Sequence, residues 1–244
     1  MIMNIVKCNT YEKMCEAAAT VIAAQIITKP DSVLGLATGG TPLGVYSALA
    51  RMHWEGMLDF SQVKTFNLDE YIGIGRDHDQ SYYFYMNKNL FSKINIKKEN
   101  INIMEGITED VDAVCAEYEM AIKASGGIDL QLLGIGGNGH IGFNEPGDFF
   151  PQETHLVELA ESTIDANSRF FPNKDDVPKT SITMGIGSIM RARKILVVAS
   201  GAGKAEILAR MVYGKVSPQL PASILQFHSD VTVITDTDAG SMLT

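Results

Sequence analysis

Short apolar runs alternate with longer amphipathic segments along most of the chain. Six runs are rich in leucine or β-branched residues and have the length of strands: Ile2–Val6, Val33–Ala37, Val63–Leu68, Leu130–Ile135, Ile195–Ala199 and Val231–Thr235. Strands that are apolar on both faces and alternate with helices are typical of a parallel sheet covered on both sides. The pattern therefore predicts an α/β fold, a Rossmann-like, mostly parallel sheet with helices on both faces.

Polar residues mark the positions where three helices are expected to begin. Asn9, with Glu12 three residues later, resembles a capping box. Thr41 stands before a proline, and Thr108 stands before two acidic residues. Because Asn and Thr side chains accept hydrogen bonds from the first backbone N–H groups of a helix, we expect these three residues to be helix caps.

The stretch 149–180 departs from the alternation because it is rich in proline, aspartate and asparagine. Such a segment is typical of a mobile cover over a functional site. The rest of the chain contains no internal repeat and no linker-like tract. We therefore expect a single domain, 1–244, in which 149–180 forms a small lid segment.

The composition excludes several classes of partner. The net charge of −9 argues against nucleic acid, because binding to a phosphate backbone depends on clustered Lys and Arg. A few local cations still suffice for a small phosphorylated ligand. The three cysteines are widely spaced without a CxxC, which indicates free thiols, and no apolar run approaches the roughly 18 residues that span a bilayer. We expect a cytoplasmic protein with neither a nucleic-acid nor a membrane partner.

The segment LGLATGGTPLGVY has the order strand, glycine turn, helix. Its turn consists of Thr38, Gly39, Gly40 and Thr41. Glycines let backbone N–H groups approach an oxyanion, the hydroxyls add donors, and the helix dipole favours negative charge. These properties favour a phosphate site, with a tight turn that merely needs glycine as the alternative.

The segment 129–147, DLQLLGIGGNGHIGFNEPG, begins as a buried strand and breaks into a glycine-rich turn. Part of it, 134–139, has the G-x-G-x-x-G spacing of dinucleotide-binding folds, but that fingerprint requires a helix to follow, and Pro146 prevents one. The turn presents Asn138, His140, Asn144 and Glu145. Ligands of parallel sheets bind at such strand ends.

His140 and Glu145 form a candidate acid–base pair. A carboxylate beside an imidazole orients the ring and raises its basicity, as proton transfer at neutral pH requires. Metal binding is the other use of such a pair, but no further His or Cys at ligand spacing supports it. We therefore expect acid–base chemistry and no metal.

Two further strand ends carry charged candidates. Asp69 and Glu70 close the run VKTFNL. Side chains alternate along a strand, so we expect one of the two acids to point into a cleft. The alternative interpretation is that both acids only cap the turn that follows. Lys204, in SGAGKA, follows another glycine turn and suits a single phosphate, although the segment lacks the residues of a nucleotide-binding P-loop. Arg169 lies in the expected lid. Its sequence context is equally compatible with an arginine that binds phosphate and with a solvated surface residue.

Taken together, seven segments spread over most of the chain resemble the glucosamine-6-phosphate deaminase family, also called glucosamine-6-phosphate isomerase. They are, in order, LGLATGGTPLGVY, FNLDEYIG, SYYFYMNKNLF, GIGGNGHIGFNEPG, ANSRFF, TMGIG and SGAGKA. The resemblance implies conversion of glucosamine 6-phosphate and water to fructose 6-phosphate and ammonia, without a metal or an organic cofactor. It is compatible with a monomer or a small homo-oligomer.

The resemblance also implies roles for individual residues. His140, supported by Glu145, would open the sugar ring, and Asp69 would move the proton at C2. The residues that would hold the 6-phosphate are Thr38, Gly39, Gly40, Thr41, Arg169 and Lys204.

Asn138 departs from the family pattern, since many members carry aspartate at this position. An amide can form a hydrogen bond to His140 but cannot ionise, so we expect more of the acid–base work to fall on Glu145. Two rivals remain open. A 6-phosphogluconolactonase-like hydrolase resembles the same fold but typically continues the glycine-histidine turn differently from the Phe143–Pro146 segment here. A non-catalytic sugar-phosphate sensor would not need the acid–base residues.

Overall fold

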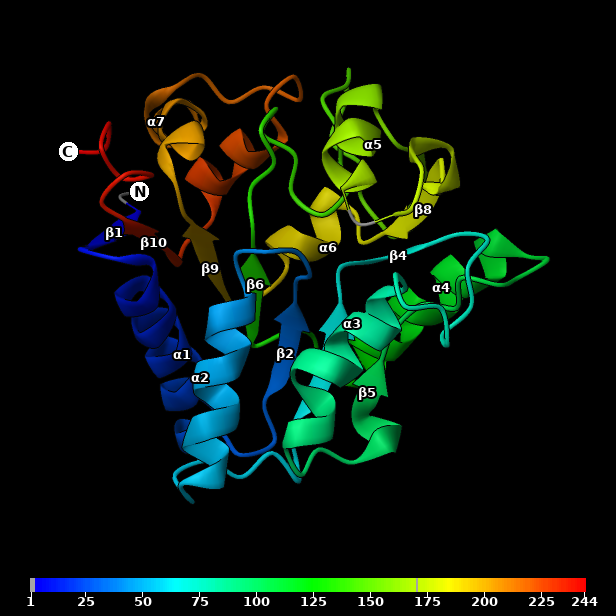
Figure 1. Cartoon of the computed structure of the whole chain (residues 1–244), viewed down its shortest axis with the longest axis horizontal. Coiled ribbons are helices and arrows are strands. Elements are labelled where there is room, and N and C mark those ends of the chain that lie inside the picture. Colours follow the sequence, from blue (N-terminus) through cyan, green and yellow to red (C-terminus); the bar gives the residue numbers. More distant parts are fainter. Residues whose placement is uncertain (1–2, 170) are drawn as a thin grey trace.

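The computed structural model describes residues 3–169 and 171–244 (Figure 1). Ile2, at the start of the first expected strand, and Phe170, in the ANSRFF segment, lie outside the described residues. Among the described residues, none of the helices combines the length and the apolar character that crossing a membrane requires.

A parallel sheet forms the centre of the molecule. Among the described residues it has seven strands in the order β1-β10-β9-β6-β2-β3-β5. Their bounds are β1 Asn4–Cys8, β2 Val33–Leu36, β3 Lys64–Asn67, β5 Ile101–Asn102, β6 Leu130–Leu133, β9 Lys194–Ala199 and β10 Val231–Asp236. The predicted α/β fold and its six runs are confirmed. The sequence did not indicate β5, which is only two residues long.

Helices cover both faces of this sheet. Their bounds are α1 Tyr11–Thr28, α2 Leu43–Trp54, α3 Tyr82–Asn89, α4 Val111–Ala124, α5 Glu161–Ser168, α6 Ile186–Met190 and α7 Ala205–Tyr213. Short 3-10 helices are found at Phe91–Lys93, Lys98–Asn100, Lys174–Asp176, Ala202–Lys204 and Pro221–Phe227. From β2 to β3 the chain moves toward the β5 edge of the sheet, whereas from β5 to β6 it moves back in the other direction. Because a crossover between parallel strands is right-handed, these two opposite directions place α2 and α4 on opposite faces of the sheet (Figure 1).

The predicted helix starts are displaced by one or two residues. The observed caps are Thr10, Pro42 and Asp110. Thr10 and Asp110 accept hydrogen bonds from the backbone N–H groups of Lys13 and Ala113, whereas Pro42 has no side chain that can do so. The predicted caps that these residues replace are Asn9, Thr41 and Thr108. Thr41 is therefore left in the loop.

A second, antiparallel sheet has the order β4-β8-β7. Its strands are β4 Asp69–Tyr71, β8 Thr180–Thr183 and β7 His155–Glu158. Asp69 and Glu70 were expected at the end of a parallel strand, but after Leu68 the chain leaves that sheet, and Asp69 pairs with Thr183 across β4 and β8. The stretch 149–180 contributes β7, α5 and the first residue of β8, so it has regular structure of its own.

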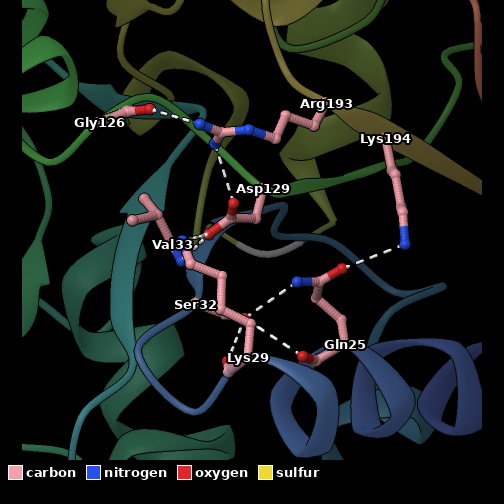
Figure 2. Close-up of polar contacts among 8 residues, drawn as sticks. All are labelled: Gln25, Lys29, Ser32, Val33, Gly126, Asp129, Arg193 and Lys194. Atoms are coloured by element: carbon pink, nitrogen blue, oxygen red, sulfur yellow. Dashed lines mark hydrogen bonds and ion pairs between the residues drawn. The ribbon is translucent and has the colours of Figure 1, made fainter.

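Asp129 joins three strands at the edge of the sheet where they begin (Figure 2). Its buried carboxylate accepts a hydrogen bond from the backbone N–H of Val33 at 2.8 Å. It also forms ion pairs with Lys29 at 2.6 Å and Arg193 at 2.9 Å. One side chain therefore ties the starts of β2, β6 and β9 together, far from the opposite edge, where the glycine turns emerge.

The direction of the chain reverses between β2 and β6. From β2 the chain continues outward to β3 and β5, whereas from β6 it continues to β9 and β10 on the other side. The loops after these two adjacent strands therefore diverge, and the crevice between them is where ligands of open α/β sheets bind.

Candidate active site

A cavity of about 850 Å³ lies at the carboxyl ends of the parallel strands. It receives the loops after β2, β6 and β9, the start of β4, and α5. The candidate residues that line it are Thr38, Gly39, Gly40, Thr41, Asp69, Asn138, His140, Arg169 and Lys204. Glu145 is not part of the lining and lies behind His140, to which it is bonded. The tertiary structure thus brings together residues from five separate segments.

The loop 38–41 has the form of an anion site. Gly39 has φ of +107°, a conformation that favours glycine, and α2 begins directly after the loop. Two tyrosines that the sequence reading missed hold the loop carbonyls. The Tyr85 hydroxyl donates to the Gly39 carbonyl at 2.6 Å, and the Tyr11 hydroxyl donates to the Thr41 carbonyl at 3.1 Å. These two hydrogen bonds hold the backbone of the loop, and N–H groups that precede the N-terminus of a helix are suited to bind an oxyanion.

Two cations, Lys204 and Arg169, lie close to each other in the lining of the cavity. The Lys204 ammonium donates to the Ile135 carbonyl at 2.6 Å. Burial and the neighbouring guanidinium of Arg169 lower the pKa of Lys204 below its usual range. Two positive charges placed close together in a partly buried position raise the local potential for an anion, so this end of the cavity suits a phosphate group.

Asp69 is a buried acid that opens to the cavity. The residue is 6% exposed, and burial, with a smaller contribution from the nearby Glu70 charge, raises the pKa of its carboxyl to about 8. Groups with strongly shifted pKa values in a cavity are candidates for proton transfer.

Glu70 points away from the cavity and has a structural role. Its carboxylate accepts hydrogen bonds from the backbone N–H groups of Tyr71, Tyr82 and Tyr83, each at 2.9 Å. Two of these donors belong to the first turn of α3, whose dipole favours a negative charge there. Strand alternation therefore separates the two acids as expected: Asp69 faces the cavity, and Glu70 caps a helix. Burial raises the pKa of Glu70 to about 7, although these hydrogen bonds oppose the shift.

His140 and Glu145 are in contact. The imidazole Nδ1 lies 3.3 Å from Glu145 Oε2. The ring packs over Gly136, where a Cβ atom would come within 2.3 Å of Nε2, so this glycine leaves space for the imidazole. Hydrogen bonds from His140, Thr163 and Asn138 outweigh burial and lower the pKa of Glu145. The carboxylate is therefore ionised at neutral pH and able to orient the ring.

Asn138 supports this pair differently from the expectation. Its Nδ2 donates to Glu145 Oε2 at 2.6 Å, and its Oδ1 accepts from the backbone N–H of His140 at 3.1 Å. The amide therefore holds the carboxylate and the turn, and these hydrogen bonds do not involve the imidazole ring. Asn144 is also structural, because its Nδ2 donates to the carbonyls of Ile141 and Met184.

Side chains that could bind a metal do not cluster in the part of the chain that the structure describes. Within residues 3–169 and 171–244, no three or more His, Cys, Asp or Glu side chains are grouped so that they could hold a metal ion. Cys8, Cys15 and Cys115 are free thiols, and burial raises the pKa of each. The described chemistry is thus concentrated in the cavity.

Known proteins are similar to this chain over nearly its whole length. Residues 7–234 match the family model described as glucosamine-6-phosphate isomerases/6-phosphogluconolactonase. A glucosamine-6-phosphate deaminase of Clostridium acetobutylicum is 55% identical over 241 residues, which cover 99% of this chain and 100% of the relative. One from Clostridium perfringens is 54% identical, with the same coverage.

Solved structures agree with this relationship. A monomeric glucosamine-6-phosphate deaminase superposes with a TM-score of 0.96 at 48% identity, covering 98% of this chain and 100% of the other. A 6-phosphogluconolactonase from Leishmania guyanensis superposes with a TM-score of 0.78 at 20% identity, covering all of both chains. At that identity, the second likeness shows a shared fold alone.

Proposed function

The chain belongs to the glucosamine-6-phosphate isomerase/6-phosphogluconolactonase family, and we propose that it is a glucosamine-6-phosphate deaminase. It is an enzyme that converts glucosamine 6-phosphate and water to fructose 6-phosphate and ammonia. The observation that carries this proposal is that one cavity is lined by the loop 38–41, by the cations Arg169 and Lys204, and by Asp69 and His140, with Glu145 bonded behind His140.

The first step is recognition of the phosphate. The N–H groups and hydroxyls of the loop 38–41 bind its oxygens, and Lys204 and Arg169 neutralise its charge. The Lys204 ammonium is bonded to the Ile135 carbonyl, and the phosphate takes the place of that carbonyl as its partner. Capture at this end of the cavity fixes the position of the sugar relative to the acid–base groups.

Ring opening follows at the other end. His140 transfers a proton between the C1 hydroxyl and the ring oxygen, and the ionised Glu145 stabilises the imidazolium form. Asp69 then removes the proton from C2 and returns a proton to C1, while one proton of the substrate amine passes to the C1 oxygen. The open-chain aldose amine thereby becomes an imine at C2 with a hydroxyl at C1. Water adds to this imine and ammonia leaves. The positively charged substrate amine favours the ionised form of Asp69 and so opposes the burial that raises the pKa of this carboxyl to about 8.

The alternative as a lactonase is not favoured. The lactonase structures are similar at 16–21% identity and share the fold, whereas the relatives above 50% identity are named deaminases. The decisive assay incubates the purified protein with glucosamine 6-phosphate and quantifies ammonia and fructose 6-phosphate. We expect the two products in equal amounts. Hydrolysis of 6-phosphogluconolactone without any release of ammonia would contradict the proposal.

The same proposal covers the organisation of the protein. We propose one domain, with 149–180 as a lid, because Thr163, Asn167 and Arg169 of that stretch line the cavity. We also propose a monomer or a small homo-oligomer in the cytoplasm, without a nucleic-acid partner. The net charge of −9 and the free cysteines support these points, and the solved relative at 48% identity is described as monomeric.

A further inference from the structure

We infer that Thr163, on α5, is a positioning residue that makes the acid–base pair depend on the seating of this helix over the cavity. The inference rests on the proposed function. The Thr163 hydroxyl donates a hydrogen bond to Glu145 Oε1. The sequence gave no indication of this contact, because the two residues are 18 positions apart and lie in different elements.

The contact completes the set of donors around the Glu145 carboxylate. Oε2 receives Asn138 and faces the His140 ring, and both of these residues belong to the same glycine-rich turn as Glu145. Oε1 is bonded to Thr163, which comes from α5 and is buried, with 5% of its surface exposed. A buried carboxylate is held in its ionised form by the hydrogen bonds that it accepts. The ionisation of Glu145 therefore depends partly on α5.

The same helix also contacts the segment that carries the other catalytic acid. One turn after Thr163, the Asn167 amide donates to the Tyr71 hydroxyl at 2.9 Å. Tyr71 lies in β4 together with Asp69. Between these polar contacts, Ile164 packs against the buried cluster of Tyr71 with Phe143 and Leu159. Helix α5 therefore contacts both the glycine-rich turn that carries Glu145 and the strand that carries Asp69.

Arg169 gives this arrangement a consequence for catalysis. It is the C-terminal cap of α5 and lines the cavity at the proposed phosphate end. A bound phosphate that attracts Arg169 also holds α5 in place, and α5 in turn presents Thr163 to Glu145. Binding energy from the phosphate, which does not react, is thereby used to order the reacting groups.

The test compares two substitutions of the same residue. Thr163→Val removes the hydroxyl and keeps the shape, whereas Thr163→Ser keeps the hydroxyl. For the valine variant we expect kcat to fall about 10- to 100-fold, as for loss of a hydrogen bond to a charged group, with KM changed less than about threefold. The acid limb of the pH–rate profile moves to higher pH, because Glu145 loses a donor and protonates more readily. The serine variant restores both properties.

Ser168→Ala is the matched control, since it removes a hydroxyl from the same helix that is bonded only to the helix carbonyl of Asp165 in the described residues. We expect its kinetics to equal those of the wild type. Thermal unfolding of each variant shows whether it folds, and Thr163→Ala replaces the valine variant if valine does not pack. Equal losses in the valine and serine variants, with an unmoved acid limb, would mean that Thr163 only stabilises α5.

A measurement without turnover separates this inference from the proposed function. Carboxyl carbon NMR follows the titration of Glu145 in the wild type and in the valine variant, both without substrate. We expect its midpoint to lie at higher pH in the variant, and an identical midpoint overturns the inference. A wild type that releases no ammonia overturns the proposed function instead, whatever the result of the titration.

Discussion

Replacing Asp69 with asparagine should strongly reduce kcat and at the same time stabilise the protein. Asp69 is 6% exposed, and burial raises the pKa of its carboxyl from 3.8 to about 8. Folding therefore places the group where its ionised form, the form that removes a proton, is disfavoured. Asparagine has the same shape and no charge, so it avoids this cost and cannot act as a base. Loss of the base should reduce kcat by about 10²–10⁴ or more.

The magnitude of the stabilisation follows from the shift in pKa. Below pH 3.8 Asp69 is protonated in both the folded and the unfolded chain, and its pKa has no effect on stability. As the pH rises, the unfolded chain releases the proton first, so the free energy of unfolding falls until the pH passes about 8. At about 1.36 kcal/mol per pH unit, the cost at pH 7 is about 4 kcal/mol. For a chain of this size, that corresponds to roughly 10 °C in Tm.

Thermal and urea unfolding of the wild type and Asp69→Asn, at several pH values between 4 and 9, measure this effect. We expect the variant to gain stability over the wild type steadily from pH 4 to about pH 8, and the difference to be constant above that. Asp31→Asn is the control, because it makes the same change of charge at an exposed position. A difference between Asp69→Asn and the wild type that does not vary with pH would refute the reasoning.

Three other substitutions test the geometry of the site and of the sheet. Asn138→Asp replaces the Nδ2 donor, which lies 2.6 Å from Glu145 Oε2, with an oxygen, so the two carboxylates should share a proton. The acid limb of the pH profile of kcat/KM should therefore move to higher pH, and a profile unchanged in both limbs would contradict this. Tyr85→Phe frees a carbonyl of the phosphate loop and should raise KM about 3- to 10-fold with kcat unchanged in steady-state assays, whereas a fall in kcat alone would assign it another role. Asp129→Asn breaks two ion pairs in which the carboxylate is buried and the cations are partly exposed, and it should cost about 2 kcal/mol in urea unfolding. Glu16→Gln, whose ion pair is exposed on both sides, should cost less than about 1 kcal/mol; equal losses would be inconsistent with the buried position of Asp129.

Much of the fold could be read from the sequence, because its signals are local. Apolar runs of strand length and the glycine turns that follow them are properties of consecutive residues, and parallel strands bring their carboxyl ends to one edge. For this reason the loop 38–41, Asp69, His140 and Lys204 were expected near one another, and they line one cavity. The helix starts were less accurate, since several neighbouring residues are able to cap a helix.

The partners of these residues were decided only by the tertiary structure. The second sheet pairs Asp69 with Thr183, and no local pattern relates segments so far apart. The separate roles of Asp69 and Glu70 depend on where α3 begins, and the amide of Asn138 bonds to Glu145 through the shape of the turn. The sequence alone therefore determined which chemical groups are present and at which strand ends they lie. Their burial, their pKa values and their hydrogen-bond partners depend on the surroundings created by distant segments, because desolvation and directed hydrogen bonds act only between groups that folding has brought into contact.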